Sequence, residues 1–434
     1  MGRDVMMSPS ATEVHVLVNT WHGTSSATSE RVCSVLAATG TRAASLHLTR
    51  SAGHCVALAS TAVKSSISSP SSPSVPTTTS RPSRILLVVV GGDGTLHEAI
   101  NGAIQASSSL SQSSPLIHIA IVPNGSGNAL AISLGIDGIE HSLRILEKYL
   151  SIVNADGDIP KSLVSPLRVA SFAVAPPPIS RHLDAWPLPQ TYIFCVVSYG
   201  LHAQIVKQSE LLRFLGNKRF QYVAWANIAF LSQYWARLWT LDARKRVYTI
   251  DDVGTEKIEF VSLDETAAQS ERSTHLVYQG EAGYSYFLCT KMTHLEKGFH
   301  ISPHSCPSSS EWDLISTTTP LREQLVQLLT GAMSTAKHLN LSFSNDAKVR
   351  GLVFEPVSPR GFVGWLFSWL WFVVTLGARE WGSADVCVDG EMWSVERGKA
   401  IWLKDLEDEK QFFHVLVPSS REGNGNEGLL QPAQ

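Results

Sequence analysis

Asp93 is the residue whose surroundings most clearly suggest chemistry, because it is a single carboxylate among three glycines. Gly91, Gly92 and Gly94 stand around it, directly after a run of six large apolar residues at 85–90. Such a run predicts a strand that is buried on both faces of a parallel sheet. Glycines leave the turn free of side chains, so a phosphate chain can approach the backbone. A carboxylate at this place can accept a proton from a hydroxyl group that attacks a terminal phosphate.

A second turn of the same kind follows in the sequence. Residues 117–122 are another strand-like apolar run, and the turn Pro-Asn-Gly-Ser-Gly-Asn at 123–128 leads into a helical stretch. Thr95, just after the first turn, is a candidate N-cap for the helix that begins there. Amides at the ends of neighbouring parallel strands and at helix N-termini can point into one cleft. The two turns therefore predict a site for a phosphate chain.

The segments GGDGTLHEAING at 91–102 and PNGSGNALA at 123–131 resemble those of the diacylglycerol kinase catalytic domain family, which includes sphingosine kinases and ceramide kinase. The resemblance covers most of residues 13–415. It implies an enzyme that transfers the γ-phosphate of MgATP to the primary hydroxyl of a sphingolipid, either a sphingoid base or ceramide. Its cofactors would be ATP and Mg2+, and Asp93 would be the catalytic base.

The resemblance also implies roles for residues outside the two turns. Arg213 and Arg219 match arginines that contact nucleotide phosphate, and Glu391 belongs to a Val-Asp-Gly-Glu element that approaches the nucleotide. Asp389 and Glu391 would help to order Mg2+, through the phosphates. Thr20 stands where the family has a proline, which weakens the match of the loop after the first strand. The implied ATP-binding residues are Asn19, Gly91, Gly92, Gly94, Thr95, Glu98, Gly125, Ser126, Arg213, Arg219 and Glu391.

The same resemblance, with the length of 434 residues, implies two domains. The first, at 13–165, is an α/β nucleotide-binding domain with a parallel sheet in three layers. The second, at 166–415, is an antiparallel β-sandwich that binds lipid, and its last motif returns to the ATP cleft. Residues 65–83 are rich in serine and proline and are expected to be a disordered insertion. Short tails at 1–12 and 416–434 are expected to be flexible.

The segment at 200–220 resembles one in sphingosine and ceramide kinases that carries a Ser-Glu pair, a leucine-glycine step and two arginines. Sphingosine kinases have carboxylates at two positions that are Gln204 and Val206 here, and one of those acids holds the lipid head group, so the resemblance implies that Gln204 and Val206 are lipid-binding positions. A buried ammonium group without a carboxylate nearby is costly. A neutral head group, that of ceramide or diacylglycerol, is therefore an open possibility beside a sphingoid base.

Residues 361–378 are uncharged, rich in tryptophan and phenylalanine, and close to the length that spans a bilayer. The motif with Asp389 follows closely and would have to return to the ATP cleft, which argues against a membrane crossing. We expect a peripheral membrane contact here. A buried core segment and an error of the gene model are the alternatives.

Composition restricts the remaining possibilities. The formal net charge is −3, which gives no argument for a nucleic-acid partner. The six cysteines lack CxxC spacing and suggest free thiols in a reducing compartment. The N-terminus lacks the apolar core of a signal peptide. We expect a cytoplasmic protein that associates peripherally with intracellular membranes and acts on a membrane lipid.

Two other functions stay open at this stage. One is a diacylglycerol kinase, which shares both glycine turns. The other is a catalytically silent, lipid-binding relative, which the altered loop after the first strand and Gln204 make conceivable. An intact Asp93, with the turn at 123–128, favours an active kinase. NAD kinase shares the first turn only and is disfavoured by the segment at 200–220.

Overall fold

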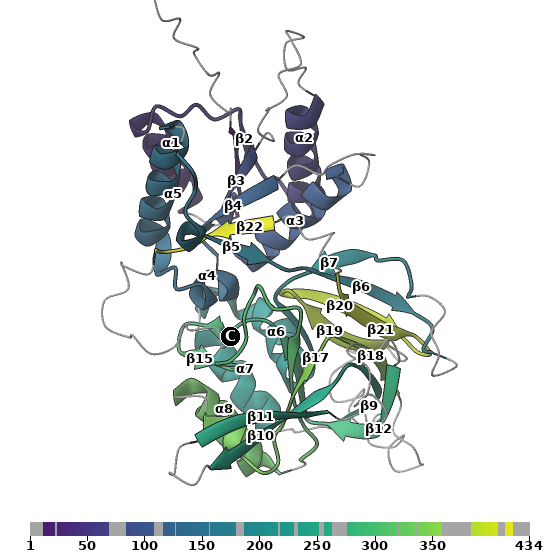
Figure 1. The fold of residues 1–434 in the computed structure, drawn as a ribbon. Helices are drawn as coiled ribbons and strands as arrows, with labels where there is room; N and C mark the ends of the chain where they lie inside the picture. Colours follow the sequence, from purple (N-terminus) through teal and green to yellow (C-terminus); the bar gives the residue numbers. More distant parts are fainter. Residues whose placement is uncertain are drawn as a thin grey trace, which may run out of the picture. The chain divides into compact units, whose positions relative to one another are not determined.

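The computed structural model divides the chain into two compact units (Figure 1). One is formed within residues 1–167 and 407–434, and the other within 168–406. The described residues are 12–21, 24–68, 84–107, 116–125, 127–155, 157–178, 186–215, 218–229, 233–250, 256–262, 276–319, 321–334, 337–357, 383–406 and 413–419.

The first unit is built on a six-stranded sheet that is mostly parallel, in the order β2-β1-β3-β4-β22-β5. Only β5 runs antiparallel to its neighbour. Residues 85–90 lie in β3 and are fully buried, which confirms the strand expected from that apolar run. The strands are β1 (Glu13–Val18), β2 (Ser45–Leu48), β3 (Arg84–Gly91), β4 (Leu116–Pro123), β5 (Val164–Leu167) and β22 (Phe413–Leu416).

Helices cover both faces of this sheet. Figure 1 shows α1 and α5 on one face and α2 and α3 on the other. In α5 the buried residues Leu143, Leu146 and Leu150 repeat at helical spacing and face the sheet. The helices are α1 (Ser25–Ala38), α2 (His54–Ser68), α3 (Asp93–Ser107), α4 (Ala129–Ser133) and α5 (Gly138–Asn154), with a 3-10 turn η1 (Lys161–Leu163).

The second unit contains two larger antiparallel sheets, in the orders β11-β10-β17-β16-β13-β8-β19-β20 and β12-β9-β18-β21-β6-β7. The first group of strands is β6 (Ala170–Ala175), β7 (Thr191–Ile193), β8 (Val196–Gly200), β9 (Tyr234–Leu241), β10 (Arg244–Ile250), β11 (Glu256–Ser262), β12 (Leu276–Tyr284) and β13 (Tyr286–Thr290). The others are β14 (His294–Glu296), β15 (Phe299–His300), β16 (Trp312–Thr317), β17 (Asn345–Val349), β18 (Gly351–Pro356), β19 (Ser383–Val388), β20 (Glu391–Glu396) and β21 (Ala400–Asp405).

One hydrophobic core joins these two sheets. Tyr199 and Phe287 come from the eight-stranded sheet, and Phe354 comes from the six-stranded one. The ring of Phe354 lies 4.7 Å from that of Tyr199 and 4.5 Å from that of Phe287. Such aromatic contacts between inner faces are the usual way in which two sheets bury their apolar sides. The helices of this unit are α6 (Leu201–Ser209), α7 (Lys218–Ala229) and α8 (Arg322–Ser334), with 3-10 turns η2 (Glu210–Leu215) and η4 (Lys337–Asn340).

The last described strand belongs to a different unit from the one expected. Residues up to 415 were assigned to the second domain, but β22 pairs with β4 and β5 of the first sheet. The prediction missed this strand because Phe413–Leu416 is only four residues long and carries no turn signal that ties it to a sheet. The first unit is therefore formed by both ends of the described chain.

Several expectations fall wholly or partly outside the described residues. The membrane-contact segment 361–378 lies outside them, as do residues 69–83 of the expected insertion and most of both expected tails. Residues 65–68 are an exception, since they complete helix α2 and are not a separate loop. All six cysteines are free thiols, as the spacing indicated.

Candidate active site

The first unit brings the predicted nucleotide-binding residues to one edge of its sheet. β1, β3 and β4 are neighbours and parallel, so the loops that follow them leave the same edge. Asn19 follows β1, Asp93 follows β3, and Gly125 follows β4. Backbone hydrogen bonds join the loops, with the Asn124 N–H donating to Gly91 O (3.0 Å) and the Asp93 N–H donating to Gly127 O (3.0 Å).

The side chain of Asp93 lies against the start of α4. The Ala129 N–H donates to its Oδ2 (2.7 Å), and the Leu130 N–H donates to its Oδ1 (3.2 Å). No residue next to α4 in the sequence caps this helix with its side chain, so Asp93 takes that place from another loop. Hydrogen bonds from both amides fix the orientation of the carboxylate. Asp93 therefore lies between the two glycine turns, as expected, and its role as a base stays a prediction.

Glycines are required for the contact between the turns. A Cβ atom on Gly92 would lie 2.5 Å from Gly127 O, and one on Gly125 would lie 2.5 Å from the Cα of Gly92. Either distance is far below an ordinary contact, and the neighbouring atoms belong to the backbone. The sequence suggested that these glycines let a phosphate approach the chain. In the structure they also let the two turns approach each other.

Two asparagines connect the loop after β1 to the glycine turns. The Asn19 side chain donates to Thr95 Oγ1 (2.8 Å). The Asn124 side chain accepts from Thr24 Oγ1 (2.8 Å) and donates to Ser25 Oγ (3.3 Å). Thr95 lies inside the first turn of α3, which begins at Asp93, so the expectation that it caps this helix is wrong. The threonine instead ties β1 to β3.

Glu98 connects helix α3 to the start of helix α2. Its two carboxylate oxygens accept the N–H groups of Gly53 (2.8 Å) and Cys55 (2.9 Å) at the start of α2. A glutamate at a helix N-terminus stabilises the free amides and the helix dipole. These contacts give Glu98 a structural role, because they hold α2 against α3. A contact between Glu98 and ATP stays a prediction. Ser126 of the second turn lies outside the described residues.

The second unit holds the Val-Asp-Gly-Glu element in a hairpin between β19 and β20. Asp389 and Gly390 have φ angles of +48° and +88°, as in the two-residue turn that joins antiparallel strands with the correct twist. The Asp389 carboxylate is 1% exposed and accepts three backbone N–H groups, those of residues 194–196, at 2.9 to 3.0 Å. Glu391 is exposed at the first position of β20.

These contacts argue against Asp389 as a direct metal ligand. Both of its oxygens are taken up by the backbone in a buried position, so the carboxylate anchors the hairpin to the start of β8. Within the described parts of the chain, no group of three or more His, Cys, Asp or Glu side chains can hold a metal ion. Mg2+ usually keeps water and phosphate ligands, so a metal carried by the nucleotide fits these residues better than a protein cage.

The two predicted arginines belong to the segment after β8. Arg219, in the first turn of α7, is 5% exposed, with its guanidinium 3.8 Å from Glu210 and 4.6 Å from the ring centre of Phe220. The Arg219 side chain is therefore not solvent-exposed. Arg213 lies in η2, and its side chain lies outside the described parts of the structure. Contacts of either residue with phosphate stay predictions.

Gln204 and Val206 both lie on α6, which packs against β8, β13 and β19. The Gln204 side chain donates to Asp385 Oδ2 (3.3 Å), and the Lys207 ammonium lies 2.9 Å from both oxygens of that carboxylate. The sequence analysis missed Asp385 and Lys207. They are 178 residues apart, and no local pattern links them.

The folds of the two units define the class of the protein, an α/β unit with a mostly parallel sheet connected to an antiparallel β unit. Comparison with known proteins specifies the class further. Residues 13–154 match the family model of the diacylglycerol kinase catalytic domain.

A curated protein and two solved structures are similar to this chain. Sphingosine kinase 1 of Mus musculus is 25% identical over 284 residues, which cover 63% of this chain and 68% of that protein. A putative diacylglycerol kinase from Bacillus anthracis str. Sterne has a similar fold, with a TM-score of 0.53 at 12% identity, over 96% of this chain and 99% of the other. Another diacylglycerol kinase structure from that organism has a TM-score of 0.48 at 12% identity, over 94% and 97% of the two chains. The family model and the similarity to sphingosine kinase 1 point to a lipid kinase.

Proposed function

We propose that this protein is an ATP-dependent kinase that transfers the γ-phosphate of MgATP to the primary hydroxyl of a sphingolipid, a sphingoid base or ceramide. The observation that carries the proposal is the joining of three loops at the ends of β1, β3 and β4, with Asp93 held between the glycine turns. Strand ends of this kind are where open α/β sheets bind their ligands. The similarity to sphingosine kinase 1 supports a sphingolipid as the acceptor of the phosphate.

Asp93 is proposed to orient the attacking hydroxyl. The two amides of α4 bind its carboxylate and hold it in one orientation. Phosphoryl transfer needs positioning and charge stabilisation more than strong basicity. The carboxylate can do this work even though hydrogen bonds from amides lower its basicity.

ATP, when bound, supplies the phosphoryl group, and its Mg2+ neutralises phosphate charge. The amides of Gly92 and Gly94 and the start of α3 are proposed to hold the phosphates. Asn19 keeps the first loop in place through Thr95. Asp389 is proposed to act indirectly, by fixing the hairpin from which Glu391 projects.

Contact with a membrane is proposed for the exposed face of α7. Tyr222 and Trp225 are 59% and 60% exposed and lie one helical turn apart. Tyrosine and tryptophan are the side chains that favour the membrane–water interface. No described helix is long and apolar enough to cross a bilayer. The segment 361–378 stays a second proposed contact.

A vesicle assay tests this contact. Trp225→Ala and Tyr222→Ala should each reduce co-sedimentation with vesicles of phosphatidylcholine and phosphatidylserine by about threefold or more, because an interfacial aromatic contributes area burial that alanine lacks. Leu46→Ala is the matched control, since Leu46 is also exposed (49%) but lies on β2. Equal binding of all three variants and the wild type would exclude α7 as the contact.

The kinase proposal is tested by transfer of radiolabelled phosphate from ATP to a panel of sphingosine, phytosphingosine, ceramide and diacylglycerol. We expect a labelled sphingolipid with the wild type and a loss of about 100-fold or more with Asp93→Asn. Glu147→Gln is a control that removes one exposed carboxylate from α5. Label on diacylglycerol alone would favour a diacylglycerol kinase. A folded protein that labels no lipid would favour a silent lipid-binding relative.

A further inference from the structure

The short hairpin of β14 and β15 in the second unit carries two histidines that lie opposite each other. His294 pairs with His300 across the two antiparallel strands. Lys297 and Gly298 form the turn between the strands, where Gly298 has a φ angle of +85°. Residues that pair directly across antiparallel strands project from the same face of the hairpin. Neither histidine has a part in the nucleotide site or in the lipid site discussed above.

The two imidazole rings are stacked on each other. Their centres lie 4.1 Å apart, and their planes are within 3° of parallel. Two positive charges at this distance repel each other, so the stack favours neutral rings. Burial lowers the pKa of both histidines, and His300 lowers the pKa of His294 further. Both rings are therefore mostly neutral near pH 7, which is the form that binds a metal ion.

The spacing of the rings suits two bonds to one metal ion. A metal–imidazole bond is about 2.0–2.1 Å long, so two such bonds join nitrogens that are roughly 3.4 Å apart at a tetrahedral angle and about 4.1 Å apart when linear. Rings with centres 4.1 Å apart bring one nitrogen each into this range after a small rotation of the side chains. Both side chains are half-buried, so an ion can reach them from solvent.

Thr293 provides an oxygen that orients the first of these rings. Its Oγ1 lies 2.9 Å from His294 Nδ1. Metal-binding histidines usually donate the hydrogen of their second nitrogen to a nearby oxygen, which fixes the tautomer and the ring orientation. With Thr293 as this acceptor, Nε2 of His294 becomes the metal ligand, and the metal ion replaces any other hydrogen bond that Nε2 makes. Thr293 is then a positioning residue.

The types of side chain restrict the kind of ion. Imidazole nitrogens suit Zn2+, Cu2+ and Ni2+, whereas Mg2+ and Ca2+ prefer oxygen ligands. Within the described ranges, no third His, Cys, Asp or Glu side chain joins the pair in a metal-binding group. The pair would therefore make an open site, in which water completes the coordination.

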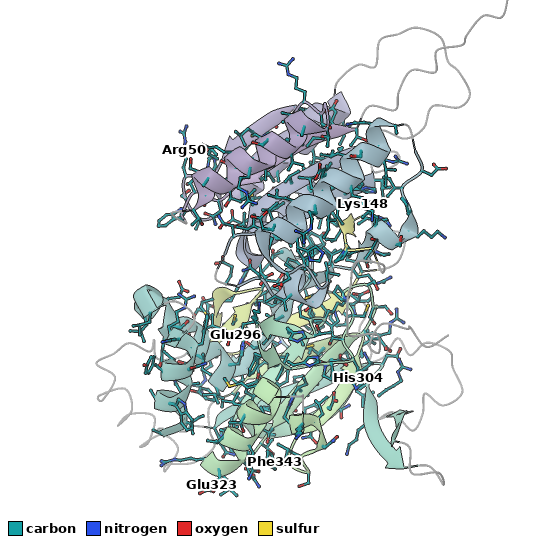
Figure 2. The ribbon with its side chains drawn as sticks, turned by 90° about the vertical axis from the view of Figure 1, so that its left-hand side faces the viewer. Arg50, Lys148, Glu296, His304, Glu323 and Phe343 are labelled. Carbon is teal, nitrogen blue, oxygen red and sulfur yellow. The ribbon has the colours of Figure 1, made fainter. Side chains whose placement is uncertain are left out.

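The hairpin lies close to an arginine of predicted function. Figure 2 labels Glu296, the last residue of β14. Burial raises the pKa of Glu296, and the positive charge of Arg219 opposes this shift, which requires the two side chains to be near each other. β15 also packs against α8. An ion held by the hairpin would thus be bound near Arg219, which is predicted to contact nucleotide phosphate.

We propose that His294 and His300 form a binding site for a divalent transition metal ion of the class of Zn2+, Cu2+ and Ni2+, and that Thr293 positions His294 in this site. The site is separate from the Mg2+ that accompanies ATP. The proposal does not depend on the proposed kinase function, because metal binding is measured without either substrate.

Isothermal titration calorimetry with Zn2+ tests the proposal on the full chain after dialysis against EDTA. The exposed thiols of Cys33 and Cys306 are first replaced by serine, since thiolates also bind Zn2+. The number of sites and the affinity are then measured for this starting protein and for three variants: His300→Ala, His294→Ala with His300→Ala, and Thr293→Val.

His141→Ala is the matched control. His141 is also half-buried, and its Nδ1 accepts the N–H of Asp137 (3.2 Å), but it lies on α5 in the first unit. Thermal unfolding without metal shows whether each variant is folded. Electron paramagnetic resonance of the Cu2+ form counts the imidazole nitrogens at the ion.

We expect one Zn2+ ion per chain in the starting protein and in the control. Thr293→Val should weaken binding by about tenfold, because loss of an outer partner costs roughly 10–100-fold in metal affinity. His300→Ala should weaken it by more than that, and the double variant should lose the site. His300→Cys should keep Zn2+ binding, since a thiolate replaces the imidazole. Cu2+ should bind more tightly than Zn2+, with two imidazole nitrogens, and Mg2+ should not bind.

Two results would overturn the proposal. One is a starting protein that binds Zn2+ no better than the double variant, which would show adventitious binding by other side chains only. The other is an affinity that His300→Ala leaves unchanged while it lowers the melting temperature without metal, which would give the histidine stack a structural role alone.

Discussion

Replacement of Gly92 by alanine should weaken both the fold of the first unit and its binding of nucleotide. The new Cβ would lie 2.5 Å from Gly127 O and 3.2 Å from the Cα of Gly125. Both are backbone atoms that no side-chain rotation can move, so the two turns must separate by roughly 1 Å. This separation would break the hydrogen bond from the Asp93 N–H to Gly127 O.

The expected size of the effect follows from the packing. Overpacking of this kind costs about 1–3 kcal/mol. For a unit of this length, each kcal/mol lowers the melting temperature by roughly 2–4 °C, so a decrease of about 2–12 °C is expected. Nucleotide should stabilise the variant less than the wild type, since amides of separated turns no longer converge on the phosphates.

Differential scanning fluorimetry with and without MgATP measures both effects. Gly127→Ala is the matched control for stability, because among the described atoms its Cβ would meet Asp93 Oδ2 alone, at an ordinary 3.5 Å. The control should keep a melting temperature close to that of the wild type. If Gly92→Ala were as stable as the control and bound MgATP as well as the wild type, the close contact between the two turns would not be the reason for glycine at position 92.

Two further predictions concern stability. Asp389→Ala should lower the melting temperature strongly, because three buried backbone N–H groups lose their acceptor. Glu391→Gln should leave the melting temperature unchanged, and equal melting temperatures of the two variants would contradict the anchoring role of Asp389. Burial, with smaller effects of His414 and Arg84, lowers the pKa of His118 to about 4. Between pH 6.5 and 4 this histidine is protonated in the unfolded chain but not in the folded one. The free energy of unfolding should therefore fall by about 3 kcal/mol as the pH decreases across that range. Guanidinium unfolding at several pH values should show a shallower decrease in stability for His118→Gln than for the wild type. An unchanged profile would mean that His118 is not the source of this pH dependence.

The sequence predicted those features that local chemistry determines. The apolar run 85–90 became the buried strand β3, and the glycine turns lie at the ends of neighbouring parallel strands. These features depend on residues close together in the chain. The mostly parallel sheet of the first unit and the antiparallel sheets of the second also agree with the expected fold class.

The missed features depend on contacts between distant residues. Asp93 caps a helix 36 residues away, and Glu98 caps one 43 residues before it. The pairing of Lys207 with Asp385 spans 178 residues. A carboxylate in the sequence does not reveal whether it will meet a phosphate, a metal or a backbone amide, because the choice depends on which loop the fold brings beside it.

Asp389 illustrates the same limit. The resemblance implied that this residue helps to order metal and phosphate. In the structure its carboxylate accepts the backbone N–H groups of residues 194–196, and the neighbouring Glu391 is exposed. The motif lies in a hairpin, and its role toward nucleotide and metal stays a prediction, while the contacts of each carboxylate required coordinates.

A crystal structure with bound MgADP tests the central claim most directly. The account predicts nucleotide phosphates against the amides of residues 91–95 and the turn at 123–128, with Asp93 still bonded to Ala129 and Leu130. Nucleotide bound away from the ends of β1, β3 and β4, or an Asp93 side chain turned out of the space between the two turns, would contradict it.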